Sequence, residues 1–125
     1  MSTLRANTLQ NANGTRTRGT CWAWVNFTSI TATAITGSFN VSSLIDNGTG
    51  DTTINFTTAL ADANYAVALG NISPTTALTS NNLTVHGDNT NPTLKSTTQL
   101  RVFSGATNTG TPGDQGQCSV VIMGN

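Results

Sequence analysis

The sequence predicts an all-β fold, an antiparallel β-sandwich of about 7–8 strands preceded by an extended N-terminal arm. The first indication is composition, because Thr, Ser and Asn together supply 50 of the 125 residues. A branched Cβ makes Thr favourable on a pleated strand, whereas Ser, Asn and Gly favour turns. The second indication is spacing, since apolar residues alternate with polar ones and nowhere keep a helical i, i+3, i+4, i+7 pattern for three turns. A chain of this length supports one modest core.

Residues 1–20 differ from the rest of the chain and are expected to form an extended attachment arm, with the β-sandwich head over residues 21–125. The arm carries three of the five basic residues and no acid. Fully extended, 20 residues reach roughly 65 Å. Isolated leucines can anchor on another chain, and arginines beside them can pair with carboxylates there; a disordered tail is the other open interpretation. The candidate attachment residues are Leu4, Arg5, Leu9, Arg16 and Arg18.

The first strand of the head is predicted over residues 21–30. Strict alternation places Ala23, Val25 and Phe27 on one face and two tryptophans, Trp22 and Trp24, on the other. Two tryptophans are more than a solvent-washed face usually carries. We therefore expect this face to be covered by a second sheet or by a neighbouring subunit.

A strand over residues 35–45 follows, in which Gly37 allows a bend or bulge. The segment 46–51, DNGTGD, then separates it from an alternating run over residues 52–57. Asn-Gly and Gly between alternating segments predict a β-hairpin, because such a turn needs residues that tolerate positive φ. A calcium site at Asp46, Asn47 and Asp51 is the rival interpretation, but the spacing is not that of an EF-hand and no Glu closes the loop.

The second half of the head alternates short strands with long polar connections. The further strands are predicted at 64–70, 83–86, 97–104 and 117–123. Long loops in a compact domain are usually functional or mobile, so the connections 73–82, 87–95 and 104–116 are the expected outward contact region. The candidate residues in or directly beside these outward loops are Asn81, His86, Asn108 and Gln115.

The ionisable residues are too few to indicate catalysis. The chain has one His, five Asp, no Glu and only 8% charged residues. Every Asp lies in or beside a turn, where Asp is expected for turn chemistry, and His86 begins a polar turn. We therefore expect no enzymatic activity, no catalytic residue, no metal site and no cofactor; only three copies of His86 meeting on an axis could build a metal site.

Charge and hydropathy also limit the partners. A net charge of zero, with only Lys95 and Arg101 basic beyond the arm, argues against nucleic-acid binding. No apolar run approaches the roughly 20 residues of a membrane span, so we expect no membrane insertion. The N-terminus lacks a signal-peptide pattern, so we expect a cytosolic origin. Cys21 and Cys118 stand at the two ends of the head, where either a disulfide or two reduced, buried thiols would suit them.

Five strings in the first half of the chain combine aromatic, turn and Asn positions. They are WVNF at 24–27, SFNVSS at 38–43, DNGTGD at 46–51, NFTT at 55–58 and NYAV at 64–67. In this order and spacing they resemble a module found at the ends of tailed-bacteriophage fibre proteins. The resemblance spans residues 22–67, and the opening STLRANTLQ at 2–10 looks like the arm that precedes this module. The chain departs from the pattern at 28–36, and nothing beyond Gly70 matches it.

The resemblance implies a structural protein of the virion, assembled in the host cytoplasm, homotrimeric and without enzymatic function. The arm would attach the subunit to other virion proteins or to its trimer mates. Aromatic side chains would lie in the sheet core or at the subunit interface. These candidate core or interface residues are Trp22, Trp24, Phe27, Phe39, Phe56 and Tyr65.

Two functional classes remain open at this point. The first is a small tail or neck fibre whose outward loops contact a glycan or protein of the host surface, although only Phe103 is aromatic beyond Gly70. The second is a capsid decoration protein whose arm clasps neighbouring shell subunits. The number of copies per particle discriminates between them.

Overall fold

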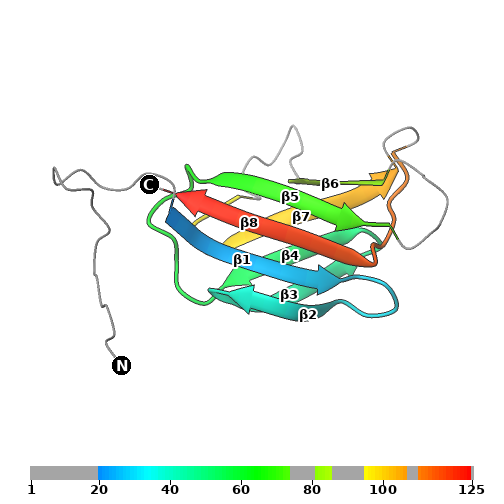
Figure 1. Cartoon of the computed structure of the whole chain (residues 1–125), viewed down its shortest axis with the longest axis horizontal. Coiled ribbons are helices and arrows are strands. Elements are labelled where there is room, and N and C mark those ends of the chain that lie inside the picture. Colours follow the sequence, from blue (N-terminus) through cyan, green and yellow to red (C-terminus); the bar gives the residue numbers. More distant parts are fainter. Residues whose placement is uncertain (1–19, 74–80, 86–94, 107–109, 125) are drawn as a thin grey trace, which may run out of the picture.

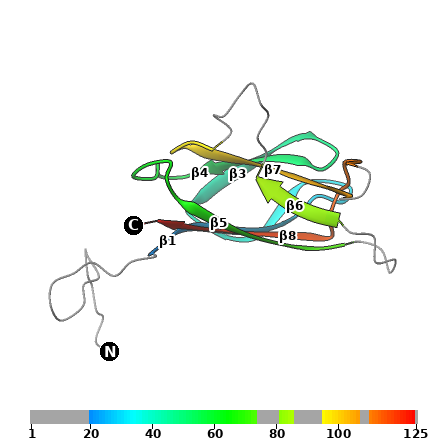
Figure 2. The same cartoon turned by 90° about the horizontal axis from the view of Figure 1, so that it is seen from above.

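The computed structural model describes residues 20–73, 81–85, 95–106 and 110–124. These residues form eight strands in two antiparallel four-stranded sheets, with the orders β2-β1-β8-β5 and β3-β4-β7-β6 (Figures 1 and 2). The strands are β1 Thr20–Thr28, β2 Ala34–Phe39, β3 Val41–Gly48, β4 Asp51–Phe56, β5 Ala66–Ile72, β6 Asn81–Val85, β7 Gln99–Ala106 and β8 Gln117–Gly124. The predicted all-β sandwich is confirmed. We call β2-β1-β8-β5 the first sheet and β3-β4-β7-β6 the second sheet.

The strand predicted over residues 35–45 is two strands that belong to different sheets. The break is at Asn40, whose φ of 55° turns the chain from β2 in the first sheet to β3 in the second. The Asn40 side chain secures this corner, because its amide donates to the carbonyls of Trp22 and Thr58. Asn tolerates left-handed backbone better than most residues, which allows a switch of sheets without glycine. The bulge expected near Gly37 is present, one residue away, in the β1–β2 pairing.

The hairpin predicted at 46–51 joins β3 to β4. Gly48 and Gly50 have positive φ values of 126° and 70°. The Asp46 carboxylate accepts the backbone N–H of Gly48, and the Asn47 amide donates to Asp51 and Thr53. The three side chains of the rival calcium interpretation therefore take part in turn and strand hydrogen bonds, as hairpin chemistry requires.

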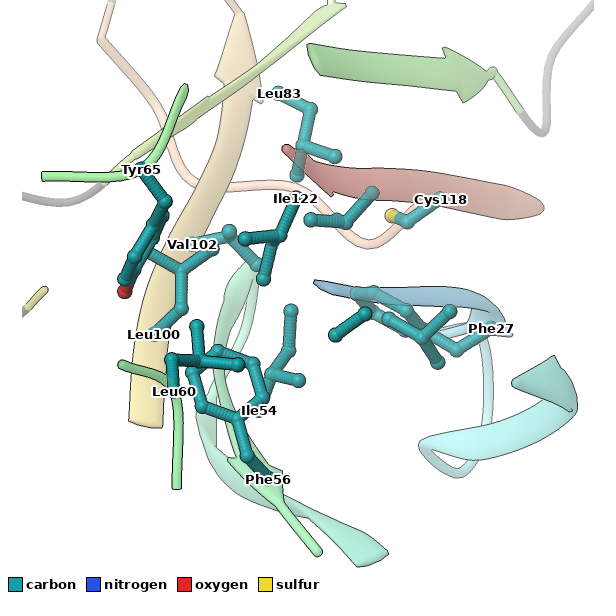
Figure 3. Packing of buried hydrophobic residues seen from close by; sticks show 13 residues of the cluster. Phe27, Ile54, Phe56, Leu60, Tyr65, Leu83, Leu100, Val102, Cys118 and Ile122 are labelled. Atoms are coloured by element: carbon teal, nitrogen blue, oxygen red, sulfur yellow. The ribbon is translucent and has the colours of Figure 1, made fainter. Parts of the chain in front are cut away.

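The core lies between the two sheets and is built from their inward-facing positions (Figure 3). Among the predicted core residues, Phe27, Phe56 and Tyr65 are buried, with 1%, 8% and 2% of their surface exposed. Phe56 and Tyr65 meet edge to face, with ring centroids 6.3 Å apart. Burial of each such side chain contributes about 1.5–3 kcal/mol to folding. Among the described residues, the other buried apolar ones are Ala23, Val25, Ile54, Leu60, Leu83, Leu100, Val102, Cys118, Val120 and Ile122.

Candidate functional site

The two sheets present very different faces to the outside. The four strands of the first sheet contain no Asp, Glu, Lys, Arg or His. The second sheet, in contrast, carries Asp46, Asp51 and Arg101. Since Thr-rich strands offer many polar residues but few charges, the absence of charge from one whole sheet is the clearest chemical asymmetry of the head.

A row of apolar side chains crosses the outer face of the first sheet. Trp24 of β1 pairs with Phe39 of β2 and with Val121 of β8, and Val121 pairs with Ala68 of β5. Directly opposite residues share one face of a sheet, so these four side chains lie in line. Phe39, Trp24 and Val121 are 54%, 36% and 36% exposed, and Ala68 is exposed.

The neighbouring row consists of small uncharged residues, Gly37, Asn26, Ser119 and Gly70, paired in the same order. The Trp24 ring lies close over Gly37, because a Cβ on this glycine would be 3.4 Å from two ring atoms. Small side chains beside a tryptophan keep the surface flat and allow another backbone to approach. We call these two rows, Phe39-Trp24-Val121-Ala68 and Gly37-Asn26-Ser119-Gly70, the uncharged face.

The second sheet does not cover the face that carries Trp24, which corrects one of the two expectations for it. The second sheet packs on the opposite side, against Ala23, Val25 and Phe27. Trp22 is half-buried and packs against the core cluster, next to a register irregularity between Cys21 and Ala23. It also lies on Gly124, where a Cβ would be 2.1 Å from the Trp22 ring. Trp24 and Phe39 are thus surface residues, and Trp22 packs at the core edge.

The outer face of the second sheet is polar and its charges are paired internally. Arg101 donates from Nε and Nη2 to the two carboxylate oxygens of Asp51, a two-pronged ion pair across β4 and β7. Asn47 adds hydrogen bonds to Asp51 and to the hydroxyl of Thr53, which is only 7% exposed. These four side chains of β3, β4 and β7 satisfy one another's hydrogen-bonding groups and need no partner to do so.

Gln115 is buried, so its expected place in an outward loop is wrong. Its side chain has no exposed surface. The amide donates to the Gly113 carbonyl and accepts from the Asn71 amide, while the backbone N–H and C=O bond to Ser29. A buried amide must have its hydrogen bonds satisfied, and Gln115 reaches β5 and the end of β1 at once.

Residues 110–116, which we call the closing segment, fold back onto the sandwich. Gly50 donates to Asp114 Oδ1 and accepts from the Ser104 N–H, and Ser104 in turn exchanges hydrogen bonds with Gly113. A Cβ on Gly50 would lie 2.3 Å from the Ser104 carbonyl oxygen, so only glycine fits there. The part of the 104–116 loop predicted as a contact region is therefore largely structural; Gly110, Thr111 and Pro112 are its exposed residues.

Of the remaining predicted loop and arm residues, the structure describes only Asn81. Asn81 is not in a loop: it opens the edge strand β6 and pairs with Ala106 of β7. The other candidates lie outside the described residues. These are His86 and Asn108 of the outward loops and Leu4, Arg5, Leu9, Arg16 and Arg18 of the arm.

A small pocket of about 160 Å³ lies at the β6–β7 edge of the second sheet. Sequence reasoning missed it, because only the pairing of Thr84 with Phe103 and of Asn82 with Gly105 brings its walls together. Its lining residues are Asn82, Thr84, Phe103, Gly105, Ala106 and Gly110. The signal that the sequence offers is Phe103, the one aromatic residue beyond Gly70.

The two cysteines cannot form a disulfide with each other in this fold. In the β1–β8 ladder, Cys21 pairs with Met123 and Cys118 with Phe27, six positions further along β1. Six residues of strand span roughly 20 Å, well beyond the reach of a disulfide. Both thiols are free, and Cys118 is buried. Burial, together with the negative charge of Asp114, raises the pKa of Cys118 to about 11, so its thiol is protonated at neutral pH.

The pKa of Tyr65 is shifted as well. Burial raises the pKa of its hydroxyl to about 12, and this hydroxyl donates a hydrogen bond to the Ser96 carbonyl. The described residues contain no group of three or more His, Cys, Asp or Glu placed to hold a metal ion. They also contain no helix long and apolar enough to cross a membrane.

No protein-family model matches this sequence, and no curated protein or solved structure shows significant similarity to it. The features available for a functional conclusion are therefore the uncharged face, the internally paired face of the second sheet, the closing segment and the pocket.

Proposed function

We propose that the chain is a structural protein of a bacteriophage virion, a small fibre-type protein whose copies assemble as a homotrimer through the uncharged face. The observation that carries this proposal is the uncharged face itself, with two exposed aromatic rings in line across it. The resemblance to the fibre module supports it, because residues 22–67 include both rings.

An apolar, charge-free surface is what the centre of a protein interface requires. Interface cores are poor in charged residues and rich in aromatic ones, and tryptophans near their centre often dominate the binding energy. Each Å² of apolar surface removed from water contributes about 25 cal/mol. Trp24 lies within the row, between Phe39 and Val121, which is the position expected of such an anchor.

A second copy of this chain suits the face better than a charged partner would. A charge-free surface can meet a neighbouring copy without like-charge repulsion and without needing a complementary charge on that copy. The second sheet, whose Asp51 and Arg101 already pair with each other, offers no comparable apolar area. The chain would therefore assemble with the first sheet inward and the second sheet outward.

The oligomeric state of the full chain tests the proposal. We expect native mass spectrometry and analytical ultracentrifugation to find trimers. Phe39→Asp should convert them to monomers, since a charge buried without a partner costs about 3–5 kcal/mol. The matched control is Ile45→Asp on the second sheet, because Ile45 is also an exposed apolar strand residue, at 48%. Circular dichroism must show both variants folded. A wild-type monomer, or equal loss of assembly in both variants, would contradict the proposal.

The number of copies per purified particle then tests the place in the virion. A few tens of copies, as trimers, agree with a tail or neck fibre. Hundreds of copies would instead make the chain a capsid decoration protein, with the arm as its clasp. An absence from the particle would reject the virion assignment while leaving the self-association result intact.

A further inference from the structure

We propose that the pocket at the β6–β7 edge is a binding site for one neutral pyranose ring of a saccharide. The pocket opens on the outer face of the second sheet, on the other side of the sandwich from the uncharged face. The inference therefore does not depend on how copies of the chain assemble.

The walls of the pocket follow from strand pairing. Thr84 and Phe103 are directly opposite on β6 and β7, and so are Asn82 and Gly105. These four outward positions place an aromatic side chain beside a hydroxyl, an amide and a position without a side chain. Beyond Gly105 the chain folds back, since Ala106 accepts the Gly110 N–H and donates to the Thr111 carbonyl. Ala106 and Gly110 give the pocket its third side.

The lining has the mixed chemistry that a sugar ring requires. Small-molecule sites are largely apolar, with a few polar groups that fix orientation, and the C–H face of a pyranose suits an aromatic wall. The Asn82 side chain is exposed and makes no hydrogen bond within the described part of the chain, so it offers two donors and one acceptor. The Thr84 hydroxyl donates to the Phe103 carbonyl and keeps its lone pairs as acceptors.

The electrostatics favour an uncharged ligand. None of the six lining residues is ionisable. Phe103 lies between Thr84 of β6 and Asp51 of β4, and the Asp51 carboxylate forms an ion pair with the Arg101 guanidinium. A volume of about 160 Å³ is below that of sites for drug-sized ligands, about 300–1,000 Å³, so one ring fits and a longer chain would extend into solvent.

An NMR titration of the full chain tests this site. The probes are methyl α-D-glucopyranoside, methyl α-D-mannopyranoside and methyl β-D-galactopyranoside, with N-acetylneuraminic acid as a charged comparison. We expect at least one neutral glycoside to shift the amide signals of Asn82, Thr84, Phe103 and Gly105 saturably. A ligand of this size is expected to bind with a dissociation constant of about 1 mM. The charged sugar should bind more weakly.

Variants assign the binding to the pocket. Asn82→Ala should weaken the binding about tenfold, the effect of losing one or two hydrogen bonds, and Phe103→Ala should abolish the saturable shifts. Ile45→Ala, on the same outer face but outside the pocket, should leave the affinity unchanged. Since Phe103→Ala can disturb β7, the exposed Asn82→Ala is the decisive variant. The proposal is overturned by the absence of saturable shifts with all three neutral glycosides, by shifts confined to other residues, by unchanged affinity in Asn82→Ala, or by tighter binding of N-acetylneuraminic acid.

Discussion

The outer faces of the two sheets differ in how far their side chains bond to one another. On the second sheet, the side chains of Asn47, Asp51, Thr53 and Arg101 form hydrogen bonds among themselves. The first sheet leaves an apolar row exposed, and its small residues keep the surface flat beside Trp24. A face that is satisfied internally stabilises the single chain. A face that exposes aromatic area gains free energy only when something covers it.

We therefore expect substitutions on the two sheets to change different measured quantities. Substitutions in the second sheet, or where its hairpin meets the closing segment, should change the free energy of unfolding of one chain. Substitutions on the uncharged face should change assembly and leave the unfolding of the isolated chain nearly unaltered. The following predictions test this separation, in order of the expected effect.

The largest effect is expected for Gly50→Ala, where the hairpin of the second sheet meets the closing segment. Gly50 has a φ of 70°, and a Cβ there would lie 2.3 Å from the Ser104 carbonyl and 2.8 Å from the Gly113 nitrogen. Left-handed backbone and overpacking together should lower the free energy of unfolding by about 3–4 kcal/mol. The matched control is Gly110→Ala, which has a φ of 67° but no atom within 4 Å of the added Cβ.

Urea unfolding followed by tryptophan fluorescence measures both variants. Because backbone strain alone acts at Gly110, its substitution should cost only about 1 kcal/mol. The gap between the two values is the contribution of the contact between hairpin and closing segment. Equal costs would show that this contact does not hold the end of the second sheet.

This end of the molecule also shows how far the sequence could predict the structure. The alternation and the Asn-Gly turn correctly predicted the hairpin, and the four later strands lie within two residues of their predicted bounds. Both signals are local, so they survive without knowledge of the tertiary fold. The burial of Gln115 could not be predicted, because its partners Ser29 and Asn71 are 86 and 44 residues away. A polar residue in a Gly-rich segment is usually exposed, and only the assembled end makes this one a core residue.

The candidate site was predictable in part. Alternation placed Trp24 on the face opposite Phe27, and the low charge was evident from composition. The line that joins Trp24 to Phe39, Val121 and Ala68 depends on strand order, which brings the two ends of the chain side by side. Pairing of β1 with β8 spans nearly 100 residues, and no short-range pattern encodes it. Trp22 departs from simple alternation because the register shifts beside it.

A smaller effect is expected when the ion pair of the second sheet is broken. Asp51→Asn removes the charge from the Arg101 pair but keeps the size of the side chain and part of its hydrogen bonding. The pair is partly exposed, so the loss in the free energy of unfolding should be about 1–2 kcal/mol, and it should shrink in high salt. Ultracentrifugation should find the oligomeric state unchanged.

The reciprocal variant is Trp24→Gln on the uncharged face. It should weaken assembly at least tenfold, since a central aromatic anchor contributes about 2 kcal/mol or more to an interface. Unfolding of the diluted, monomeric chain should change by less than about 0.5 kcal/mol. If Asp51→Asn altered assembly, or Trp24→Gln destabilised the monomer as strongly as Asp51→Asn, the two faces would not have separate roles.

The smallest effect concerns the layer between the two faces and appears only at high pH. Burial raises the pKa of Tyr65 to about 12 from its usual 10.0, so between these pH values the folded chain keeps the hydroxyl neutral while the unfolded chain ionises it. The stabilisation from this group is complete below pH 10 and is lost as the pH rises to 12, about 1 kcal/mol of it by pH 11.

Tyr65 is the only tyrosine, so absorbance at 295 nm reports its ionisation directly. Tyr65→Phe should remove this part of the alkaline decline in unfolding free energy, although loss of the hydrogen bond to Ser96 lowers its stability at neutral pH. A tyrosine that titrated near pH 10 in the native protein would contradict this prediction and would mean that solvent reaches the core between the two sheets.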